Sequence, residues 1–263
     1  MSQVLVHEKD IVVPGQELAH GMDYLPGNGT YRFHDKILAK RLGLVMVDGR
    51  AIKIIALSGR YIPKRNDVII GNIVDVTMNG WIFDINSAYT AMLSVRDATS
   101  EFVNRGADLR MFFELGDCVV TKIVNVTSQK LVDLTTKGPG LRKLHGGRII
   151  TVNSNKVPRI IGKQGSMVSL VKHATGCKII VGQNGFVWLQ GEPEQEVIAL
   201  QTIRKIENEA HISGLTEKIQ KFLEEKTGKS MRQIPFERNG QSEHSENGEN
   251  GEQSEQNEGE FHE

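Results

Sequence analysis

The sequence predicts a multidomain protein that is mainly β and includes one α+β region. Short apolar runs separated by Gly, Asn and Asp turns occupy residues 11–135, as in small β domains. The hydrophobic period changes from that of strands to that of helices after Gly147. A chain of 263 residues with 39% hydrophobic but only 6% aromatic content suits several small cores better than one large core.

Residues 1–62 form the first expected domain, an N-terminal β domain. A Pro-Gly pair interrupts the strand pattern of residues 11–18, and PGNGTY marks a second turn. Asp48-Gly49 lies between two apolar runs, which is a strong hairpin signal. The segment SGRYIPKR then closes the domain with Pro63 and three basic residues, which indicates a boundary.

The second domain, residues 63–145, has the pattern of a five-stranded barrel of the OB type. We expect strands at residues 68–77, 81–85, 89–95, 118–126 and 130–135. The long connection between the third and fourth strands matches a small Greek-key barrel. Such barrels bind single-stranded nucleic acid in a basic groove that carries aromatic side chains.

The third domain, residues 146–212, has the element order β-α-α-β-β-α, which is that of a KH domain. Pro158 opens a short helix, and the next helix has Met167, Leu170, Val171 and Ala174 on one face. A hairpin turn at residues 183–185 precedes a longer helix. A further short helix at residues 215–225 is expected in the C-terminal extension, residues 213–238.

The net charge of zero averages two unlike parts of the chain. Residues 239–263 contain eight glutamates and no lysine or arginine, so the rest of the chain has a net charge of +8. All of this excess lies in residues 96–178, with 14 basic and six acidic side chains, and such a block is typical of polyanion binding. The low-complexity composition of residues 239–263 predicts a disordered acidic tail.

The stretch VPRIIGKQG contains the main candidate site. It lacks the P-loop lysine and the dinucleotide fingerprint, but has I-I-G-x-x-G between two helices, where KH domains hold a nucleic-acid backbone. Glycines let the backbone approach phosphate closely, and the next helix directs its first amides toward the anion. The expected RNA-binding residues are Arg159, Gly162, Lys163, Gln164, Gly165 and Lys172.

The barrel followed by the KH pattern, together with PGNGTY and GRYIPKRNDVIIGNIVDV, resembles the RNA exosome cap subunits of the ribosomal-RNA-processing protein four type, in their archaeal form. The resemblance covers residues 5–212. The paralogous cap subunit has a zinc ribbon, for which this chain lacks the paired C-x-x-C motifs.

The resemblance implies a non-catalytic, cytoplasmic subunit that binds single-stranded RNA. It implies three copies on a ring of RNase-PH-like subunits, docked through the N-terminal domain, with the paralogous cap subunit as a further partner. The S1 domains, which are the barrels of this family, surround an entry pore, and RNA is threaded inward for 3′-to-5′ degradation or processing.

The barrel departs from one family pattern. RNA-binding S1 domains commonly display two aromatics from F-G-x-F, whereas Asn79 and Ile82 occupy those positions here. Trp81 and Phe83 are expected to point into the core. We therefore expect RNA contacts through basic residues with little sequence preference, and the candidates are Arg96, Arg105, Arg110 and Lys122.

No motif indicates an enzyme, a cofactor or a metal site. The chain lacks H-E-x-x-H and G-x-S-x-G, and its acidic residues are scattered before the tail. His173 and Cys177 have no partner ligands in the sequence pattern, and Cys118 and Cys177 are expected to be buried, reduced thiols. Neither a secretory signal nor a membrane span is expected.

Two other functions fit part of the sequence. A free-standing S1/KH RNA-binding protein in translation or ribosome assembly would explain the barrel and the KH pattern, but it leaves the N-terminal domain without a role. A purely structural clamp that holds ring subunits together would need no RNA contact.

Overall fold

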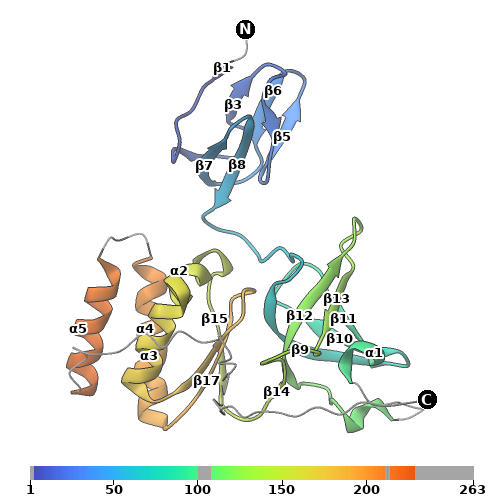
Figure 1. The fold of residues 1–263 in the computed structure, drawn as a ribbon, viewed down its shortest axis with the longest axis vertical. Helices are drawn as coiled ribbons and strands as arrows, with labels where there is room; N and C mark the ends of the chain where they lie inside the picture. Colours follow the sequence, from blue (N-terminus) through green and yellow to red (C-terminus); the bar gives the residue numbers. More distant parts are fainter. Residues whose placement is uncertain (1–2, 100–107, 211, 213, 229–263) are drawn as a thin grey trace, which may run out of the picture. The chain divides into compact units, whose positions relative to one another are not determined.

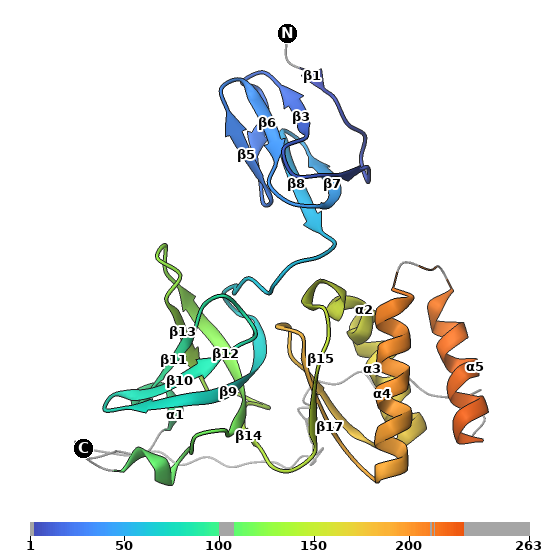
Figure 2. The ribbon, with the colours of Figure 1, turned by 180° about the vertical axis from the view of Figure 1, so that it is seen from behind.

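A computed structural model of the chain describes residues 3–99, 108–210, 212 and 214–228. Residues Met1–Arg232 make up one compact unit, which contains three folded regions (Figures 1 and 2). The predicted acidic tail lies outside the described residues, as does part of the C-terminal extension. The expected fold class is otherwise confirmed: an N-terminal β domain is followed by an OB-type barrel and a KH domain.

The N-terminal domain consists of two four-stranded sheets. The first has the order β1 (Gln3–Val4), β3 (Glu17–His20), β6 (Lys36–Ala39) and β5 (Thr30–Phe33). The second has the order β2 (Ile11–Val12), β7 (Gly43–Asp48), β8 (Ala51–Ala56) and β4 (Leu25–Pro26). The predicted hairpin joins β7 and β8, and Asp48 pairs with Ala51 around Gly49 and Arg50. Buried side chains from both sheets, including Leu18, Ile37 and Val45, form the core.

The second sheet of this domain has an apolar outer face. Val12, Val45 and Ile54 point into the core, so strand alternation directs their neighbours outward. Ile11 pairs with Leu44, which in turn pairs with Ile55, so the three residues form one row across the sheet. The exposed large apolar residues on or beside this row, which we call the outer apolar face, are Ile11, Val13, Leu42, Met46, Ile55 and Leu57.

The second region is a closed five-stranded barrel. Its strands are β9 (Val68–Thr77), β10 (Gly80–Asp84), β11 (Ala91–Ser94), β12 (Cys118–Val126) and β13 (Val132–Thr135). Strand β13 pairs in parallel with β11 and antiparallel with β12, which closes the barrel. The connection from β11 to β12 contains α1 (Val95–Ala98) and η1 (Leu109–Met111), and β14 (Lys143–Leu144) extends the sheet beside β12.

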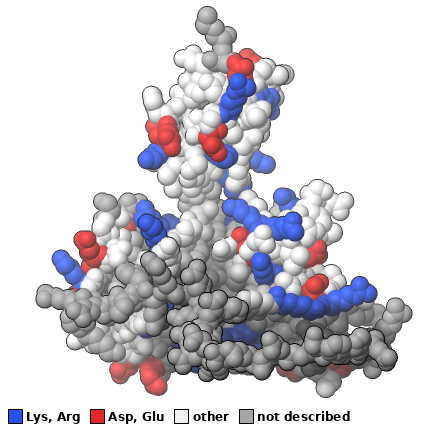
Figure 3. All heavy atoms as spheres, in the orientation of Figure 1, with Lys and Arg blue, Asp and Glu red and all other residues white. Residues whose placement is uncertain are grey.

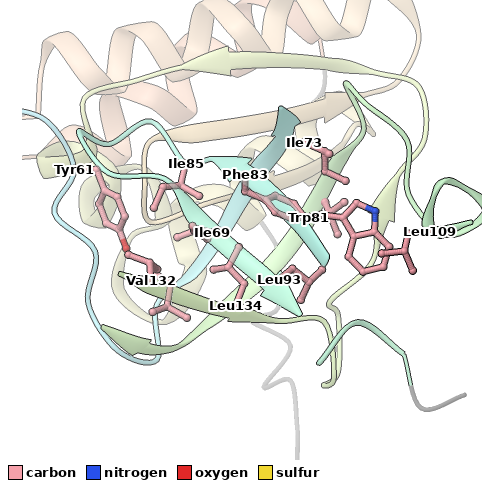
Figure 4. Close-up of a cluster of buried hydrophobic side chains, with 13 residues drawn as sticks. Tyr61, Ile69, Ile73, Trp81, Phe83, Ile85, Leu93, Leu109, Val132 and Leu134 are labelled. Carbon is pink, nitrogen blue, oxygen red and sulfur yellow. The ribbon is translucent and has the colours of Figure 1, made fainter. Parts of the chain in front are cut away.

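Large side chains fill the barrel, as Figure 4 shows. Trp81 and Phe83 are fully buried, which confirms that they point inward. The indole Nε1–H of Trp81 donates to the carbonyl of Phe113 at 3.0 Å, so its only polar group is satisfied inside the barrel. These rings therefore stabilise the barrel and are not available for base stacking.

The third region has the predicted KH order. Its strands β15 (Arg148–Thr151), β17 (Phe186–Gln190) and β16 (Lys178–Val181) form an antiparallel sheet. The helical elements are η2 (Ser154–Lys156), α2 (Val157–Ile161), η3 (Lys163–Gly165), α3 (Ser166–Thr175) and α4 (Pro193–Asn208). An additional helix, α5 (Leu215–Thr227), lies beside α3 and α4 (Figure 1) and buries Leu215, Ile219 and Leu223.

The two cysteines are free thiols, as expected. Cys177 is buried, but Cys118 is only half-buried, because it lies at the start of β12 beside the chain entering the strand. Partial burial and the nearby carboxylate of Asp117 raise the pKa of the Cys118 thiol.

Candidate nucleic-acid interface

The segment between α2 and α3, residues 162–165, forms an exposed turn that we call the KH loop. Its backbone is left-handed at three positions: φ is 76° at Gly162, 54° at Gln164 and 80° at Gly165. A Cβ atom at Gly162 would lie 2.6 Å from the amide nitrogen of Met167, so only glycine fits there. At Gly165 the surrounding space is open, so its glycine is favoured by the backbone angle alone.

The KH loop presents a positive and hydrogen-bonding surface. Lys163 and Gln164 are both exposed. No side chain caps the N-terminus of α3, although the amide of Ser166 donates to the carbonyl of Lys163. The positive end of this ten-residue helix therefore faces the loop and favours an anion there. This combination of a helix N-terminus, a lysine and missing Cβ atoms suits a phosphate group of a nucleic-acid backbone.

The two flanking basic candidates differ in their distance from the loop. Arg159 lies in the last turn of α2, is exposed and is three residues before Gly162. Lys172 is also exposed but lies in the last turn of α3, about 10 Å along the helix axis from Gly165. The structure therefore brings Arg159 to the loop and separates Lys172 from it.

The basic candidates of the barrel lie on different elements. Arg96 is exposed on α1, Arg110 is exposed on η1, and Lys122 is half-exposed on β12. The last candidate, Arg105, lies outside the described residues. None of the three described candidates lies on β10 or β11, the strands that OB barrels commonly use.

The outer surface of β10 and β11 is instead acidic and apolar. Strand pairing aligns Ile82 with Asp75 and Met92, and Met92 with Asp133. Asp133 in turn accepts a hydrogen bond from Asn125 at 3.4 Å. This row, which we call the outer row, contains two carboxylates and no basic or aromatic side chain, so it is poorly suited to a phosphate backbone or to stacked bases.

The sequence prediction missed the role of the turn between β16 and β17. It identified residues 183–185 as a hairpin turn, whereas the structure places this turn against the barrel. Asn184 is fully buried and donates to the carbonyls of Ile70 (2.7 Å) and Ile85 (3.0 Å). The asparagine between Gln183 and Gly185 was the one sequence feature that could have indicated this contact. A buried asparagine side chain needs hydrogen-bond partners, and a short turn does not supply enough of them.

A second set of contacts joins the same two domains. Ile70 and Val120 of the barrel pack with Leu144 and with Trp188 of the KH sheet in one buried cluster. Within the KH domain, the indole Nε1–H of Trp188 donates to the carbonyl of Gly146 at 2.8 Å, which fixes the ring in this cluster. The barrel and the KH domain are therefore joined by both buried hydrogen bonds and apolar packing.

The described residues offer little for other chemistry. In this part of the chain, no group of three or more His, Cys, Asp or Glu side chains is positioned to hold a metal ion. None of its helices is long and apolar enough to cross a membrane.

Comparisons with known proteins agree with this architecture. A KH-domain family model matches residues 147–205, and a model described as the exosome complex exonuclease RRP4 N-terminal region matches residues 11–48. The exosome complex component Rrp4 of Methanothermus fervidus is 43% identical over 84% of this chain and 97% of its own length. The chain belongs to the Rrp4 family of exosome components.

Other Rrp4 relatives give the same result. The exosome complex component Rrp4 of Methanothermobacter thermautotrophicus is 44% identical over 86% of this chain and 71% of its own length. A crystal structure described as a candidate RNA-binding protein of the exosome complex is 38% identical, with a TM-score of 0.59, over 64% of this chain and 97% of its own. The similarity to Rrp4 extends from the N-terminal domain through the KH domain.

Proposed function

We propose that this Rrp4 family member is a non-catalytic RNA-binding cap subunit of an exosome. The observation that carries the proposal is the KH loop, with its left-handed backbone, exposed Lys163 and uncapped α3, in a chain of the Rrp4 family. The loop would bind the phosphates of single-stranded RNA, because its backbone amides and lysine recognise charge and not base identity.

The barrel would guide the bound strand toward a pore built by other subunits, where RNA is degraded or processed 3′ to 5′. Arg96, Arg105, Arg110 and Lys122 are the proposed phosphate contacts of the barrel, and Lys172 would add a contact beyond the KH loop. Since stacking aromatics are missing from the outer row, this guidance would show little sequence preference and a strong dependence on salt. The proposed cellular location is the cytoplasm.

The N-terminal domain would dock this subunit onto RNase-PH-like ring subunits. Support comes from the outer apolar face, where Ile11 has a relative exposure of 65% and Ile55 of 49%. Contiguous apolar patches of this kind mark protein–protein interfaces. We propose three copies per ring, with the paralogous cap subunit as a further partner.

Affinity purification of the tagged full chain from nuclease-treated lysate of its own source tests this function. Recovery of RNase-PH-like subunits without RNA is the expected result. Recovery of no such subunit, with RNA binding intact in the purified protein, would favour a free-standing RNA-binding protein. Phosphate-dependent RNA loss by the purified chain alone would contradict the non-catalytic role.

A further inference from the structure

Five basic residues lie where the linker, the barrel and the KH domain meet. They are Arg60, Lys64, Arg65, Lys122 and Lys156, and we call them the junction patch. Three of them belong to the segment SGRYIPKR, whose charges have no role in the function proposed above. Arg60, Lys64 and Arg65 are exposed, and Lys122 and Lys156 are half-exposed.

The linker is fixed to the barrel directly beside Lys122. Tyr61 is buried in the barrel core, and its hydroxyl donates to the carboxylate of Asp67 at 2.5 Å. The amide of Asn66 donates to the carbonyl of Ile123 at 2.8 Å, and the amide of Ile123 donates to the carbonyl of Asp67 at 2.9 Å. The turn that contains Lys64 and Arg65 is therefore held next to the middle of β12, where Lys122 precedes Ile123.

The KH domain reaches the same place from the other side. The amide of Gln183 donates to the carbonyl of Val68 at 2.9 Å, and Val68 is the strand partner of Lys122. From this turn, the carbonyl of Gly185 accepts the amide of Val152 at 2.8 Å, two residues before η2 begins. Lys156 ends η2, so backbone hydrogen bonds connect its segment to the strand pair at Lys122.

The linker also contacts η2. The side-chain amide of Asn155 donates to the carbonyl of Gly59 at 3.4 Å. Because Arg60 follows Gly59 and Lys156 follows Asn155, this bond brings the backbones at Arg60 and Lys156 close together. Arg159 follows Lys156 by three residues, so the two side chains lie on the same face of the helix. The KH loop begins three residues after Arg159. Basic side chains thus continue from the linker turn to Lys163.

Two carboxylates lie beside this patch. Asp67 interacts electrostatically with Lys64, and Glu207, which is paired with Arg204, accepts the amide of Asn153 at 2.7 Å, three residues before Lys156. The neighbouring sequence is otherwise poor in acidic residues. The chain has no acidic residue from position 118 to 132 or from 145 to 191, and Asp67 is the only one from 59 to 70. The Asp67 carboxylate accepts the hydroxyl of Tyr61. Among the described residues, no member of the patch takes part in an ion pair. Figure 3 shows several groups of Lys and Arg atoms on one face of the molecule, with Asp and Glu atoms among them.

We propose that the junction patch binds the phosphate backbone of single-stranded RNA and continues the KH loop into one longer binding path. Lysines and arginines on fixed backbone segments attract consecutive phosphates without reading bases. The KH loop alone spans roughly four nucleotides. An RNA strand bound there therefore reaches the junction patch only if it is longer than that. The inference rests on the proposed RNA-binding function and names a second surface for it.

The test compares the full-length protein with the double variant Lys64→Ala/Arg65→Ala. A matched control, Lys221→Ala/Lys226→Ala, removes two exposed lysines from α5. Dissociation constants are measured for oligo(A) of about 5 and about 20 nucleotides over a series of salt concentrations. For the long oligonucleotide we expect the test variant to lose about tenfold in affinity and its log–log salt slope to fall by about 1.4, two contacts at about 0.7 each.

The short oligonucleotide and the control variant should bind like the wild-type protein. If the test variant binds the long oligonucleotide with unchanged affinity and salt slope, the junction patch is not part of the path and the inference is wrong. If the wild-type protein binds neither oligonucleotide, the proposed RNA-binding function itself fails, and the two failures are thereby distinguished. An equal loss for both lengths would also contradict a second surface.

Discussion

The side chain of Asn184 pairs with the backbone of Ile70 across 114 residues of sequence. Its amide donates to the carbonyl of Ile70 at 2.7 Å, and its carbonyl oxygen accepts the amide of Ile70 at 3.3 Å. The side chain therefore completes the hydrogen bonds of a barrel strand as a neighbouring strand would. Because Asn184 is fully buried, water cannot replace it.

Replacing Asn184 by alanine should destabilise the protein by roughly 2–4 kcal/mol, since several buried backbone groups lose their partner. Urea unfolding would measure the loss. The neighbouring Gln183→Ala variant is the control, because Gln183 is exposed and uses its backbone amide for the contact with Val68. Equal stability of the two variants would show that the Asn184 hydrogen bonds do not hold the domains together.

The double variant Lys163→Asp/Gln164→Asp should lose RNA affinity by at least about tenfold, because it places two carboxylates where a phosphate would lie. Fluorescence anisotropy with oligo(A) at several salt concentrations measures affinity and salt slope. Gln201→Asp/Lys221→Asp makes the same change of charge at exposed positions of α4 and α5. An RNA affinity and a salt slope that match the wild-type values would show the KH loop to be structural.

Ile82→Ala and Met92→Ala should each leave RNA affinity within about twofold of the wild-type value. Base stacking in other single-strand binders contributes roughly 1–3 kcal/mol per base, but the outer row has no aromatic side chain to provide it. Filter binding of single-stranded RNA would detect the difference. A loss of tenfold or more at Met92, in a variant that unfolds like the wild-type protein, would place RNA on this face.

Ile55→Glu should prevent recovery of ring subunits while leaving RNA binding unchanged. A charge at the centre of the outer apolar face would have to be buried without a partner when the domain docks, which costs several kcal/mol. Co-purification and RNA binding are measured on the same preparation. Val197→Glu, at an exposed apolar position on α4, is the control. If Ile55→Glu still co-purifies with ring subunits as the wild-type protein does, the docking surface is not the outer apolar face.

Tyr61→Phe should destabilise the protein by about 1 kcal/mol near neutral pH and by less in acid. Burial raises the pKa of Asp67, and the Tyr61 hydroxyl opposes this by stabilising the carboxylate. Without the hydroxyl the folded-state pKa rises further, so the variant gains more stability than the wild-type protein as the pH falls through that pKa.

Urea unfolding at about pH 7 and about pH 4 would test the pH dependence of this pair. The difference in stability between the two proteins should narrow at the lower pH, since a larger share of Asp67 is then protonated in both and the hydroxyl has less charge to stabilise. A difference that is constant with pH would show that the hydroxyl does not act on the charged carboxylate. The phenol itself stays protonated in this range, because burial raises the pKa of Tyr61.

Much of the fold follows from local sequence. Strands β9 and β12 begin and end at the expected residues, because each is a long apolar run bounded by turns. The inward orientation of Trp81 and Phe83 followed from alternation around Ile82. Strand β14 was missed, because its two residues are too few to show a strand pattern and only its pairing with β12 makes it a strand.

The candidate site was only partly predictable, because local features can be read from the sequence but strand pairing cannot. The KH loop is a local feature, in which two glycines set the backbone and the following helix supplies amides, so its residues could be named from the sequence. Lys172 could be named as a candidate from the following helix, and the structure places it about 10 Å along the axis of α3 from Gly165. The acidic outer row could not be predicted, since strand register brings Asp75 and Asp133 to one line.

The sequence by itself determined the order of the domains, the glycine loop and the uneven distribution of charge. These properties depend on neighbouring residues or on composition. Only the tertiary structure decided that Asn184 joins two domains and that the basic residues of the linker lie beside Lys122 and Lys156. Such relationships arise from backbone hydrogen bonds between segments far apart in the chain, and no local pattern encodes their pairing.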